Sequence, residues 1–328
     1  MEALLPGLFR IEVPLPQSPL QTLNSYVFRG KDRHLVVDTG FNREECFQTL
    51  STALQSLELA PEQTDFFITH LHADHYGLVS RLAHPSSRIF FSRPDAEVLE
   101  TWEGFEPMIA YAGMNGFPEN ELRQALDQHP GNKYGTEWIP GLSVLRDGER
   151  IHYGEYDLFC VETPGHTLGH VCLYNPEHRF LISGDHILGD ITPNIQCWSD
   201  AGNPLDDYFR SLEKVDRMDV DLVLPGHRSL VMDFHGRIAE LRRHHEARLR
   251  EIETILAGDG QMCAYDVAGK MTWDIRCDRW EDFPVAQKWF ATGEAIAHLR
   301  FLERRETIRR SASNGKLRFH ICGKPSIH

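Results

Sequence analysis

The alternation of apolar and polar residues predicts short strands and helices in regular succession. Leu8–Val13 alternates at a period of two, and a second short strand pattern follows at 25–28. The apolar run 34–40 ends near Asp38, which is typical of a strand leading into a loop. Apolar residues at helical spacing then predict a helix over 43–58. Strand and helix in this order predict an α/β (α+β) fold with helices packed on sheets.

Four later apolar runs each lead into histidine or aspartate. The segments that follow these runs are THLHADHYG at 69–77, PGHTLGH at 164–170, SGDH at 183–186 and PGH at 225–227. Side chains on loops at strand ends, held by a rigid sheet, are where metal sites usually lie. We therefore expect these four segments to supply a shared site.

The segment 69–77 places three imidazoles and one carboxylate within six consecutive residues. His70 and His72 lie two apart, so an extended chain turns both toward one side, while Asp74 and His75 beyond the bend can face a second ion. Nitrogen and carboxylate donors of this kind suit zinc, iron or manganese. The alternative is a histidine-rich surface loop, since the chain has 18 histidines. Four potential ligands in HxHxDH order favour the metal site.

Residues 101–140 interrupt the strand–helix rhythm. Aromatic and apolar side chains, Trp138 among them, alternate there with Gly, Pro and polar residues, which predicts a mostly helical insertion. The insertion could be a lid whose aromatics contact substrate, or it could simply pack on the domain. Strands at 156–161 and 171–174 follow it, and the latter is predicted to pair with 180–182 as a hairpin.

The C-terminal third is predicted to be mainly helical. Helical patterns cover roughly 205–217, 236–257 and 284–304, and residues 307–310 with 317–321 can form a hairpin across Ser313–Gly315. A helix followed by a hairpin is the closing half of a winged-helix module. We predict one main domain at 1–235, including the insertion, and a C-terminal helical, winged-helix-like unit at 236–328.

Composition narrows the class of protein. The chain of 328 residues has 41% hydrophobic and 10% aromatic residues, its mean hydropathy is -0.38, and no apolar stretch reaches the roughly 18 residues of a membrane span. The N-terminus has no signal-peptide pattern, and the seven cysteines contain no CxxC pair. We therefore expect a cytoplasmic protein with reduced thiols and no membrane partner.

The formal charge of -14 opposes nucleic-acid binding on average. The tail is an exception, because Lys and Arg outnumber Glu from residue 284 onward, with Lys324 the last of these cations. This could be a surface for nucleic acid or an acidic cofactor, or a solvated helix face and hairpin, which we favour. We expect no nucleic-acid partner, and we leave a second subunit open.

The four segments, in this order and at these spacings, resemble the metallo-β-lactamase superfamily over roughly residues 8–230, in the manner of its glyoxalase II-like members. The resemblance implies an αββα sandwich with a two-metal site at one edge of two facing sheets. It implies that the first metal is held by His70, His72 and His166, the second by Asp74, His75 and His227, and that Asp185 bridges both. Asp38 matches an acid near the site rather than a ligand. His84, His170, His178 and His186 lie at none of the ligand positions, and we expect them to be structural or solvent-facing, with His186 the first candidate for an exception.

The chemistry implied by the resemblance is hydrolysis by a hydroxide held between two divalent ions, zinc first, with iron or manganese as alternatives. Asp74 could also orient the hydroxide. The superfamily's oxygen-reducing members carry an acid where this chain has His72, which disfavours redox chemistry. The aromatic insertion suits an acyl group, so we expect a thioester or other carboxylic ester as substrate. A metal-dependent phosphodiesterase or nuclease, and a non-enzymatic protein that only binds metal, are the alternatives.

Overall fold

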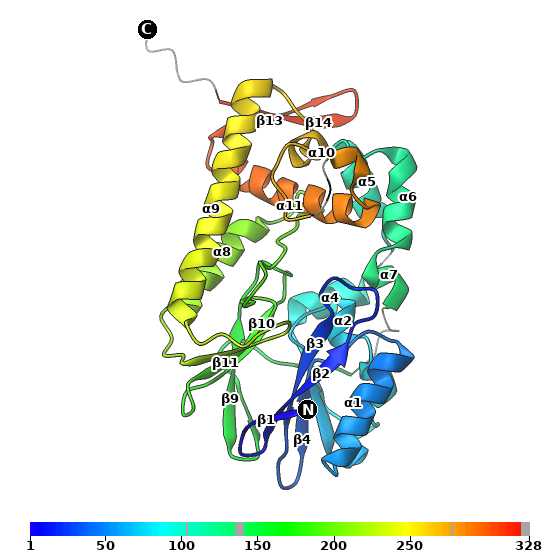
Figure 1. The fold of residues 1–328 in the computed structure, drawn as a ribbon, viewed down its shortest axis with the longest axis vertical. Coiled ribbons are helices and arrows are strands. Elements are labelled where there is room, and N and C mark those ends of the chain that lie inside the picture. The colour runs from blue at the N-terminus through cyan, green and yellow to red at the C-terminus, as the bar shows by residue number, and fades with distance from the viewer. Residues whose placement is uncertain (103, 135–140, 276, 278, 323–328) are drawn as a thin grey trace. The chain divides into compact units, whose positions relative to one another are not determined.

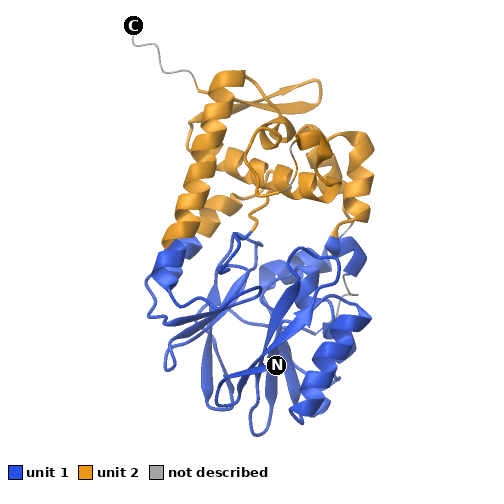
Figure 2. Ribbon diagram, in the orientation of Figure 1, with its two compact units in different colours: residues 1–102, 130–193, 210–238 blue, residues 103–129, 194–209, 239–328 orange. Residues whose placement is uncertain are grey.

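The computed structural model describes residues 1–102, 104–134, 141–275, 277 and 279–322. Trp138 of the predicted insertion and Lys324 of the basic tail lie outside the described residues. The chain forms two compact units (Figure 2). The first comprises the described residues of 1–102, 130–193 and 210–238, and the second those of 103–129, 194–209 and 239–328. The domain boundary predicted at residue 235 stays a prediction.

Two β-sheets make the body of the first unit (Figure 1). The seven-stranded sheet follows chain order: β1 Glu2–Leu5, β2 Leu8–Pro14, β3 Thr22–Phe28, β4 His34–Val37, β5 Thr64–Phe67, β6 Ile89–Phe91 and β7 Ser143–Val144. The five-stranded sheet has the order β12-β11-β10-β9-β8: β8 Arg150–Tyr153, β9 Tyr156–Glu162, β10 Val171–Asn175, β11 Phe180–Gly184 and β12 Leu222–Pro225. The predicted hairpin of β10 and β11 is confirmed.

The two sheets pack face to face over a shared apolar core. Phe28 of β3 lies edge-on to Tyr156 of β9, with ring centroids 5.2 Å apart, and stacks on Phe180 of β11 at 6.2 Å. Along β5, Phe67 joins this inner core while its neighbour Phe66 faces a second core on the other side of the sheet. Burial on both faces explains why the central strands are continuous apolar runs in the sequence.

Helices cover the outer face of the seven-stranded sheet. The helices of the first unit are α1 Glu44–Ser56, α2 Ala73–Tyr76, α3 Val79–Leu82, α4 Arg93–Glu100 and α7 Pro130–Tyr134. Cys46 and Leu50 of α1 pack on Val36 and Phe66 in the outer core, which confirms the helix predicted over 43–58. The α/β class predicted from the sequence is therefore correct.

Parallel pairing brings the ends of several strands to one edge. Strands β4, β5 and β6 are parallel neighbours in the first sheet, and β11 and β12 are parallel neighbours in the second. The carboxyl ends of parallel strands meet at the same sheet edge, where loops can gather functional side chains. Three of the four histidine- and aspartate-bearing segments lie at the ends of β5, β11 and β12, and Asp38 follows β4.

The second unit is built around one buried helix. Its elements are α5 Glu106–Met114, α6 Glu119–Asp127, α10 Ala264–Ala268, α11 Val285–Arg304, β13 Ile308–Ser313 and β14 Lys316–Ile321. Helix α11 is buried on nearly all sides from Lys288 to Leu302, as expected for a central helix. The predicted helix and hairpin at 284–321 are confirmed, while the likeness to a winged helix stays a prediction.

Residues 104–129 of the predicted insertion contribute to this second unit. Phe117 and Leu122 are buried with Trp289 of α11, and Trp289 also stacks on Trp198 with ring centroids 4.0 Å apart. Two longer helices, α8 Pro204–Val215 and α9 Phe234–Asp259, have residues in both units. No helix among the described residues has the length and apolar content to cross a bilayer.

Replacing Trp289 with Ala is expected to destabilise the protein by about 3–5 kcal/mol, because the ring is 1% exposed and its loss leaves a large cavity. Urea unfolding followed by far-UV circular dichroism measures the change. Trp102→Ala is the control, because Trp102 is 46% exposed and its loss should cost well under half as much. Equal losses for the two variants would contradict the central role of Trp289.

Candidate metal centre

The predicted ligands all lie in loops or first helical turns at one edge of the two sheets. His70 and His72 follow β5, Asp74 and His75 lie in the adjoining α2, His166 lies between β9 and β10, Asp185 follows β11, and His227 follows β12. All seven belong to the first compact unit. The tertiary structure therefore brings together every residue that the sequence assigned to the site.

Three of the histidines form one close group. The Nδ1 atom of His72 lies 3.0 Å from Nε2 of His70 and 3.0 Å from Nε2 of His166. One ion with tetrahedral geometry and bonds of 2.0–2.1 Å would hold nitrogens about 3.3 Å apart. The three nitrogens thus have the spacing that a single zinc-sized ion requires.

A second group gathers histidine and carboxylate donors. The Nε2 atom of His227 lies 3.4 Å from Oδ2 of Asp74 and 3.5 Å from Oδ1 of Asp185. The Nε2 atom of His75 lies 3.5 Å from the same Asp185 oxygen and 4.0 Å from Oδ2 of Asp74. Two nitrogens and two carboxylates therefore converge on one point.

Asp185 faces both groups with different oxygens. Its Oδ2 lies 3.5 Å from Nε2 of His166 in the first group, while its Oδ1 faces His75 and His227 in the second. A carboxylate in this position can bind one ion through each oxygen. This is the arrangement expected of a bridging residue.

Several potential metal-ligand atoms at this edge are buried and have no hydrogen-bond partner among the described residues. Nε2 of His75, Nε2 of His227 and Oδ1 of Asp185 have no hydrogen-bond partner among the described residues. A buried acceptor left unpaired costs about 1–3 kcal/mol, so three together at one point are costly unless a cation binds there. Imidazole nitrogens and carboxylate oxygens also form a suitable donor set for a divalent metal ion.

The remaining ring nitrogens are held by partners behind the site. Nδ1 of His75 lies 2.7 Å from Oδ2 of Asp38, and Nδ1 of His227 lies 2.7 Å from the carbonyl oxygen of Thr22. Nδ1 of His70 contacts the Thr69 hydroxyl at 3.0 Å, and that hydroxyl donates to Asp38 at 2.9 Å. Protons on these Nδ1 atoms leave the Nε2 lone pairs directed into the site.

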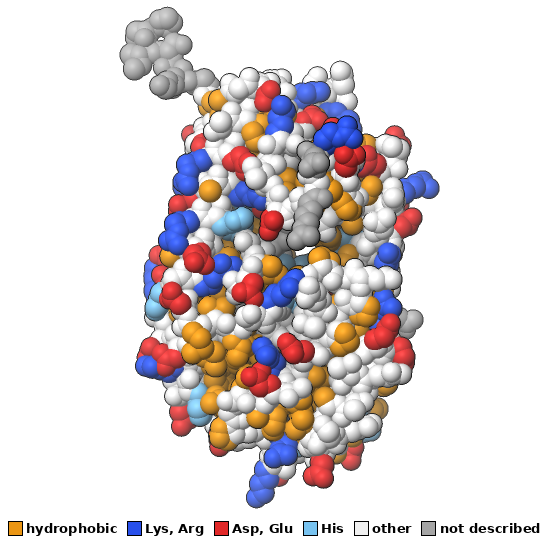
Figure 3. Space-filling model, in the orientation of Figure 1, with side chains coloured by type: hydrophobic (Ala, Val, Ile, Leu, Met, Phe, Trp, Pro, Cys, Tyr) orange, Lys and Arg blue, Asp and Glu red, His pale blue; other side chains and the backbone are white. Residues whose placement is uncertain are grey.

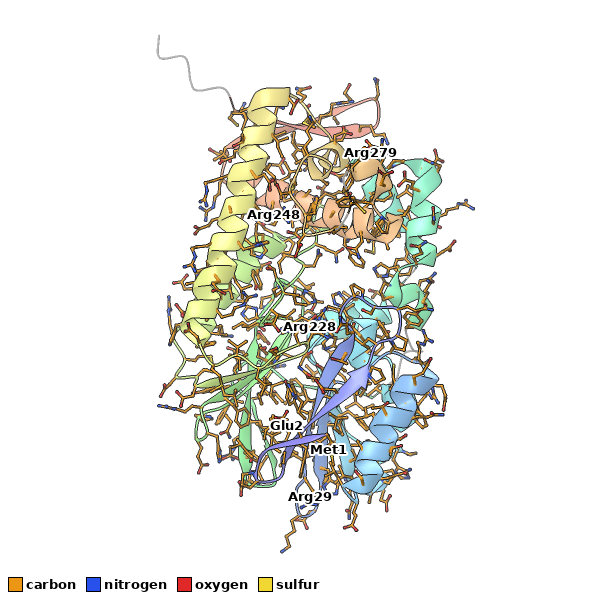
Figure 4. All side chains as sticks on the ribbon, viewed as in Figure 1. Met1, Glu2, Arg29, Arg228, Arg248 and Arg279 are labelled. Atoms are coloured by element: carbon orange, nitrogen blue, oxygen red, sulfur yellow. The ribbon has the colours of Figure 1, made fainter. Side chains whose placement is uncertain are left out.

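The loop that carries His227 is anchored to β3. The side-chain amide of Asn24 donates to the carbonyl oxygens of Pro225 at 3.0 Å and Arg228 at 2.9 Å, on either side of the histidine. Arg228, which Figure 4 labels, has a left-handed backbone conformation with a φ of 65°. The loop also passes close to the site, because a Cβ on Gly226 would lie 2.7 Å from Oδ1 of Asp185.

The comparisons with known proteins agree with this geometry. The model of the metallo-beta-lactamase superfamily matches residues 21–227, which include the whole candidate site. This chain belongs to the metallo-β-lactamase superfamily. Residues 281–322 match a second model, described as the metallo-beta-lactamase-like C-terminal domain. The resemblance seen in the sequence is confirmed, and the protein is a metallo-hydrolase with a site for divalent ions.

Solved structures extend the likeness to nearly the whole chain. A metallo-beta-lactamase family protein from Thermus thermophilus is 28% identical with a TM-score of 0.82, and the match covers 98% of this chain and 100% of that one. A beta-lactamase domain protein from Burkholderia ambifaria is 26% identical with a TM-score of 0.84, covering 98% and 94%. The two-sheet superfamily fold predicted for this chain is therefore confirmed.

Among curated relatives, a human protein named acyl-coenzyme A thioesterase MBLAC2 is 25% identical over 210 residues, which is 62% of this chain and 72% of the human protein. A Caenorhabditis elegans protein named beta-lactamase-like protein 2 homolog is 25% identical over 262 residues, which is 78% of this chain and 74% of the relative.

Electrostatics differ between the two ligand groups of this superfamily member. Burial, reinforced by the neighbouring His166, lowers the pKa of His72 to about 3, and burial also holds the pKa of His70 well below its usual value. At neutral pH His70 and His72 are therefore uncharged imidazoles. Neutral ligands leave a bound ion its full charge.

The second group lies in a negative environment. Burial opposes the charged form of His75, but the carboxylates of Asp38, Asp185 and Asp74 outweigh burial and raise its pKa to about 10. Burial also opposes the ionised form of Asp74, yet His75 and His227 hold its pKa below the ordinary range. The carboxylates that stabilise a proton on His75 would also stabilise a bound cation.

His170, which the sequence placed among structural histidines, hydrogen-bonds to the backbone of Asp185. Its Nε2 accepts a hydrogen bond of 3.1 Å from the backbone N–H of Asp185, and its Nδ1 lies 2.8 Å from the Thr163 hydroxyl. His170 is the last residue of the PGHTLGH motif, which is the signal in the sequence that could have indicated its role. His84 and His178, by contrast, contact Ser86 and Asn175 away from the ligands.

Asp95 is a buried residue at the site that the sequence did not indicate. It lies at the start of α4, between the two loops that carry His70, His72 and His166. Burial raises the pKa of Asp95 to about 6 against the opposing effect of its hydrogen bonds. The only local signal, a Ser three residues earlier, predicts a helix start and no role in a metal site.

Proposed function

We propose that the protein is a dinuclear metal-dependent hydrolase that cleaves a thioester or another carboxylic ester. The observation that carries the proposal is the position of Asp185, which offers one oxygen to the three-histidine group and the other to the group of Asp74, His75 and His227. A single carboxylate between two donor groups favours two ions at once.

Divalent ions bound at these residues would supply Lewis acidity and would lower the pKa of a water molecule that they bind. His70, His72 and His166 would hold one ion, and as imidazole ligands without negative charge they would leave it able to polarise a substrate carbonyl. Asp74 lies at the edge of the second group, 8% exposed and ionised, and is placed to accept a hydrogen bond from the attacking water and orient it.

Two observations support an acyl substrate. Leu168 is 63% exposed in the loop between His166 and His170, so an apolar side chain is available beside the ligands. The human and bovine relatives at 25% and 26% identity are named acyl-coenzyme A thioesterases. A thiolate is a good leaving group and needs little help from a protein acid.

A substrate screen tests the proposal directly. Protein purified without chelator and loaded with Zn²⁺ is assayed against acyl-coenzyme A thioesters, lactones and bis(p-nitrophenyl) phosphate, with His72→Ala and His84→Ala as matched variants. We expect thioesters to give the highest kcat/KM, His72→Ala to lose at least about 100-fold, and the exposed His84 variant to match the wild type. Preference for the phosphodiester would overturn the acyl assignment and favour a phosphodiesterase or nuclease.

The charge distribution bears on that alternative. Cationic and anionic side chains are interspersed on the face in view (Figure 3). In the tail, Arg310 pairs with Glu303 at 3.2 Å and with Asp200, and Arg300 pairs with Glu303. Because internal partners engage these cations, they are poorly suited to phosphate contacts, and we propose no nucleic-acid partner. Zinc as the native ion and a cytoplasmic location also stay predictions.

A further inference from the structure

The carboxylate of Asp95 joins two loops that are far apart in the sequence. Its Oδ2 accepts hydrogen bonds from the backbone N–H of Leu71 at 2.9 Å and from the Thr167 hydroxyl at 2.8 Å. Its Oδ1 accepts a bond of 2.7 Å from the backbone N–H of Gly169. Asp95 is fully buried, so these three donors replace the water that an ionised carboxylate would otherwise bind.

Two of the three donors are residues next to the predicted ligands. Leu71 stands between His70 and His72, and Thr167 directly follows His166. One side chain therefore fixes the backbone on both sides of the three-histidine group. The Leu71 and Thr167 donors are each one residue from a predicted ligand, and Gly169 lies three residues beyond His166 in the same loop.

The loop bearing His166 lies directly on the first turn of α4. A Cβ on Gly169 would come within 2.2 Å of the Ser92 hydroxyl and 2.6 Å of the Asp95 backbone nitrogen. Ser92 caps the helix, and Pro94 occupies its first turn, so the helix start is well defined. The well-defined first turn of α4 therefore supports the loop, and Asp95 in that turn accepts the hydrogen bonds from Thr167 and Gly169.

The second ligand group is held by other contacts. His75 bonds to Asp38, and His227 bonds to the carbonyl oxygen of Thr22. The backbone N–H of Thr69 donates to Asp38 rather than to Asp95, at 2.9 Å. Of the two buried carboxylates, Asp95 bonds to the loops of the three-histidine group, whereas Asp38 bonds to His75 directly and reaches His70 through the Thr69 hydroxyl.

We propose that Asp95 is a positioning residue that sets the spacing of His70, His72 and His166, and so controls the affinity of one of the two metal ions. The inference rests on the proposed dinuclear site. It predicts that removing the carboxylate weakens the ion of the three-histidine group and leaves the ion of the other group in place.

Asp95→Asn keeps the size of the side chain but replaces one acceptor oxygen with an NH₂ donor. Whichever way the amide turns, its NH₂ faces at least one N–H or O–H that it cannot accept from. We expect the affinity for one Zn²⁺ to fall about 10–100-fold, as for other residues that orient metal ligands, and the affinity for the second to change by less than about 3-fold. Competition against a chromophoric zinc chelator, with elemental analysis of the dialysed protein, measures both steps.

Substitution of Thr167 gives a milder variant. It tests the inference even if Asp95→Asn does not fold. Thr167→Val removes one of the three hydrogen bonds and should weaken the same ion about 3–10-fold. Thr167→Ser retains the hydroxyl and should restore the wild-type titration. A purely structural effect would not follow the presence of this hydroxyl.

Asp65 is the matched control for loss of a buried carboxylate. It is also fully buried, at the opposite end of β5, where it binds Arg33, Arg88 and the Tyr153 hydroxyl. Asp65→Asn should lower the thermal unfolding temperature but leave both zinc affinities of the folded protein within about 3-fold of the wild type.

The outcomes separate the two proposals. Wild-type protein that binds two Zn²⁺ ions, with an Asp95→Asn titration that is unchanged or weakened equally at both steps, overturns the inference and leaves the dinuclear site intact. Equal loss in Asp65→Asn would also overturn it, by showing a general effect of destabilisation. Wild-type protein that takes up fewer than two ions contradicts the proposed function itself.

Discussion

Asp185→Ala is expected to lower the metal content from two ions per chain to fewer than one and to reduce kcat/KM on the order of 10³-fold. The residue is 6% exposed and its two oxygens face the two ligand groups, so its loss removes a donor from each. Polarisation by a metal ion is worth several kcal/mol of transition-state stabilisation, and about 1.4 kcal/mol corresponds to a tenfold change in rate. Elemental analysis and steady-state kinetics measure the two effects.

Asp32→Ala is the control, because Asp32 is exposed in the turn between β3 and β4. It should keep both ions and full activity. The apo forms of both variants should have circular dichroism spectra like that of the wild type, since Asp185 contributes a ligand rather than core packing. An Asp185→Ala protein that retains two ions would show that the carboxylate does not bridge them.

Gly226→Ala is expected to weaken metal binding while every ligand remains in the chain. The added methyl group would lie 2.7 Å from Oδ1 of Asp185 and 2.9 Å from Cε1 of His75, closer than van der Waals contact permits. The backbone at 226 has little freedom to move away, because its N–H bonds to Gly184 and its carbonyl oxygen accepts from Asn24. We expect at least about a 10-fold loss of Zn²⁺ affinity, as seen when ligand orientation is disturbed.

Gly258→Ala is the matched substitution, because a Cβ at this position in α9 meets open space. It should leave metal binding unchanged and stabilise the protein by about 0.5–1 kcal/mol, the usual gain of Ala over Gly in a helix. Chelator competition and urea unfolding distinguish the two variants. Zinc affinity that is equal in Gly226→Ala and wild type would contradict the tight packing of the ligand cage.

Local chemistry made the ligand positions visible in the sequence. Four of the predicted ligands lie within six consecutive residues: His70, His72, Asp74 and His75. Residues this close in the sequence stay close in space however the neighbouring strand and loop are arranged. The apolar runs before Asp185 and His227 predicted strands, and the structure has β11 and β12 there. The pattern of a buried strand that ends in a polar residue lies within a single segment, so it can be recognised from the sequence of that segment alone.

The grouping of residues 104–129 with α11 could not be predicted in the same way. Phe117 and Leu122 belong to the aromatic insertion, which could have been a lid or a packed element. Their burial with Trp289 joins positions more than 160 residues apart, and it depends on shape complementarity among side chains rather than on periodicity.

The sequence by itself predicted the α/β class, because apolar periodicity is a property of single segments, and the motifs at 69–77, 164–170, 183–186 and 225–227 carried the resemblance that implies the superfamily and the seven predicted ligands. The tertiary structure alone decided which nitrogen of each histidine faces the site and which residues hold it there. Asp95, Asp38 and the carbonyl oxygen of Thr22 act across 24 to 205 residues of chain. Hydrogen bonds of this kind exist only once the sheets have paired and the loops have met, since their geometry is set by distances in space and not by positions along the chain.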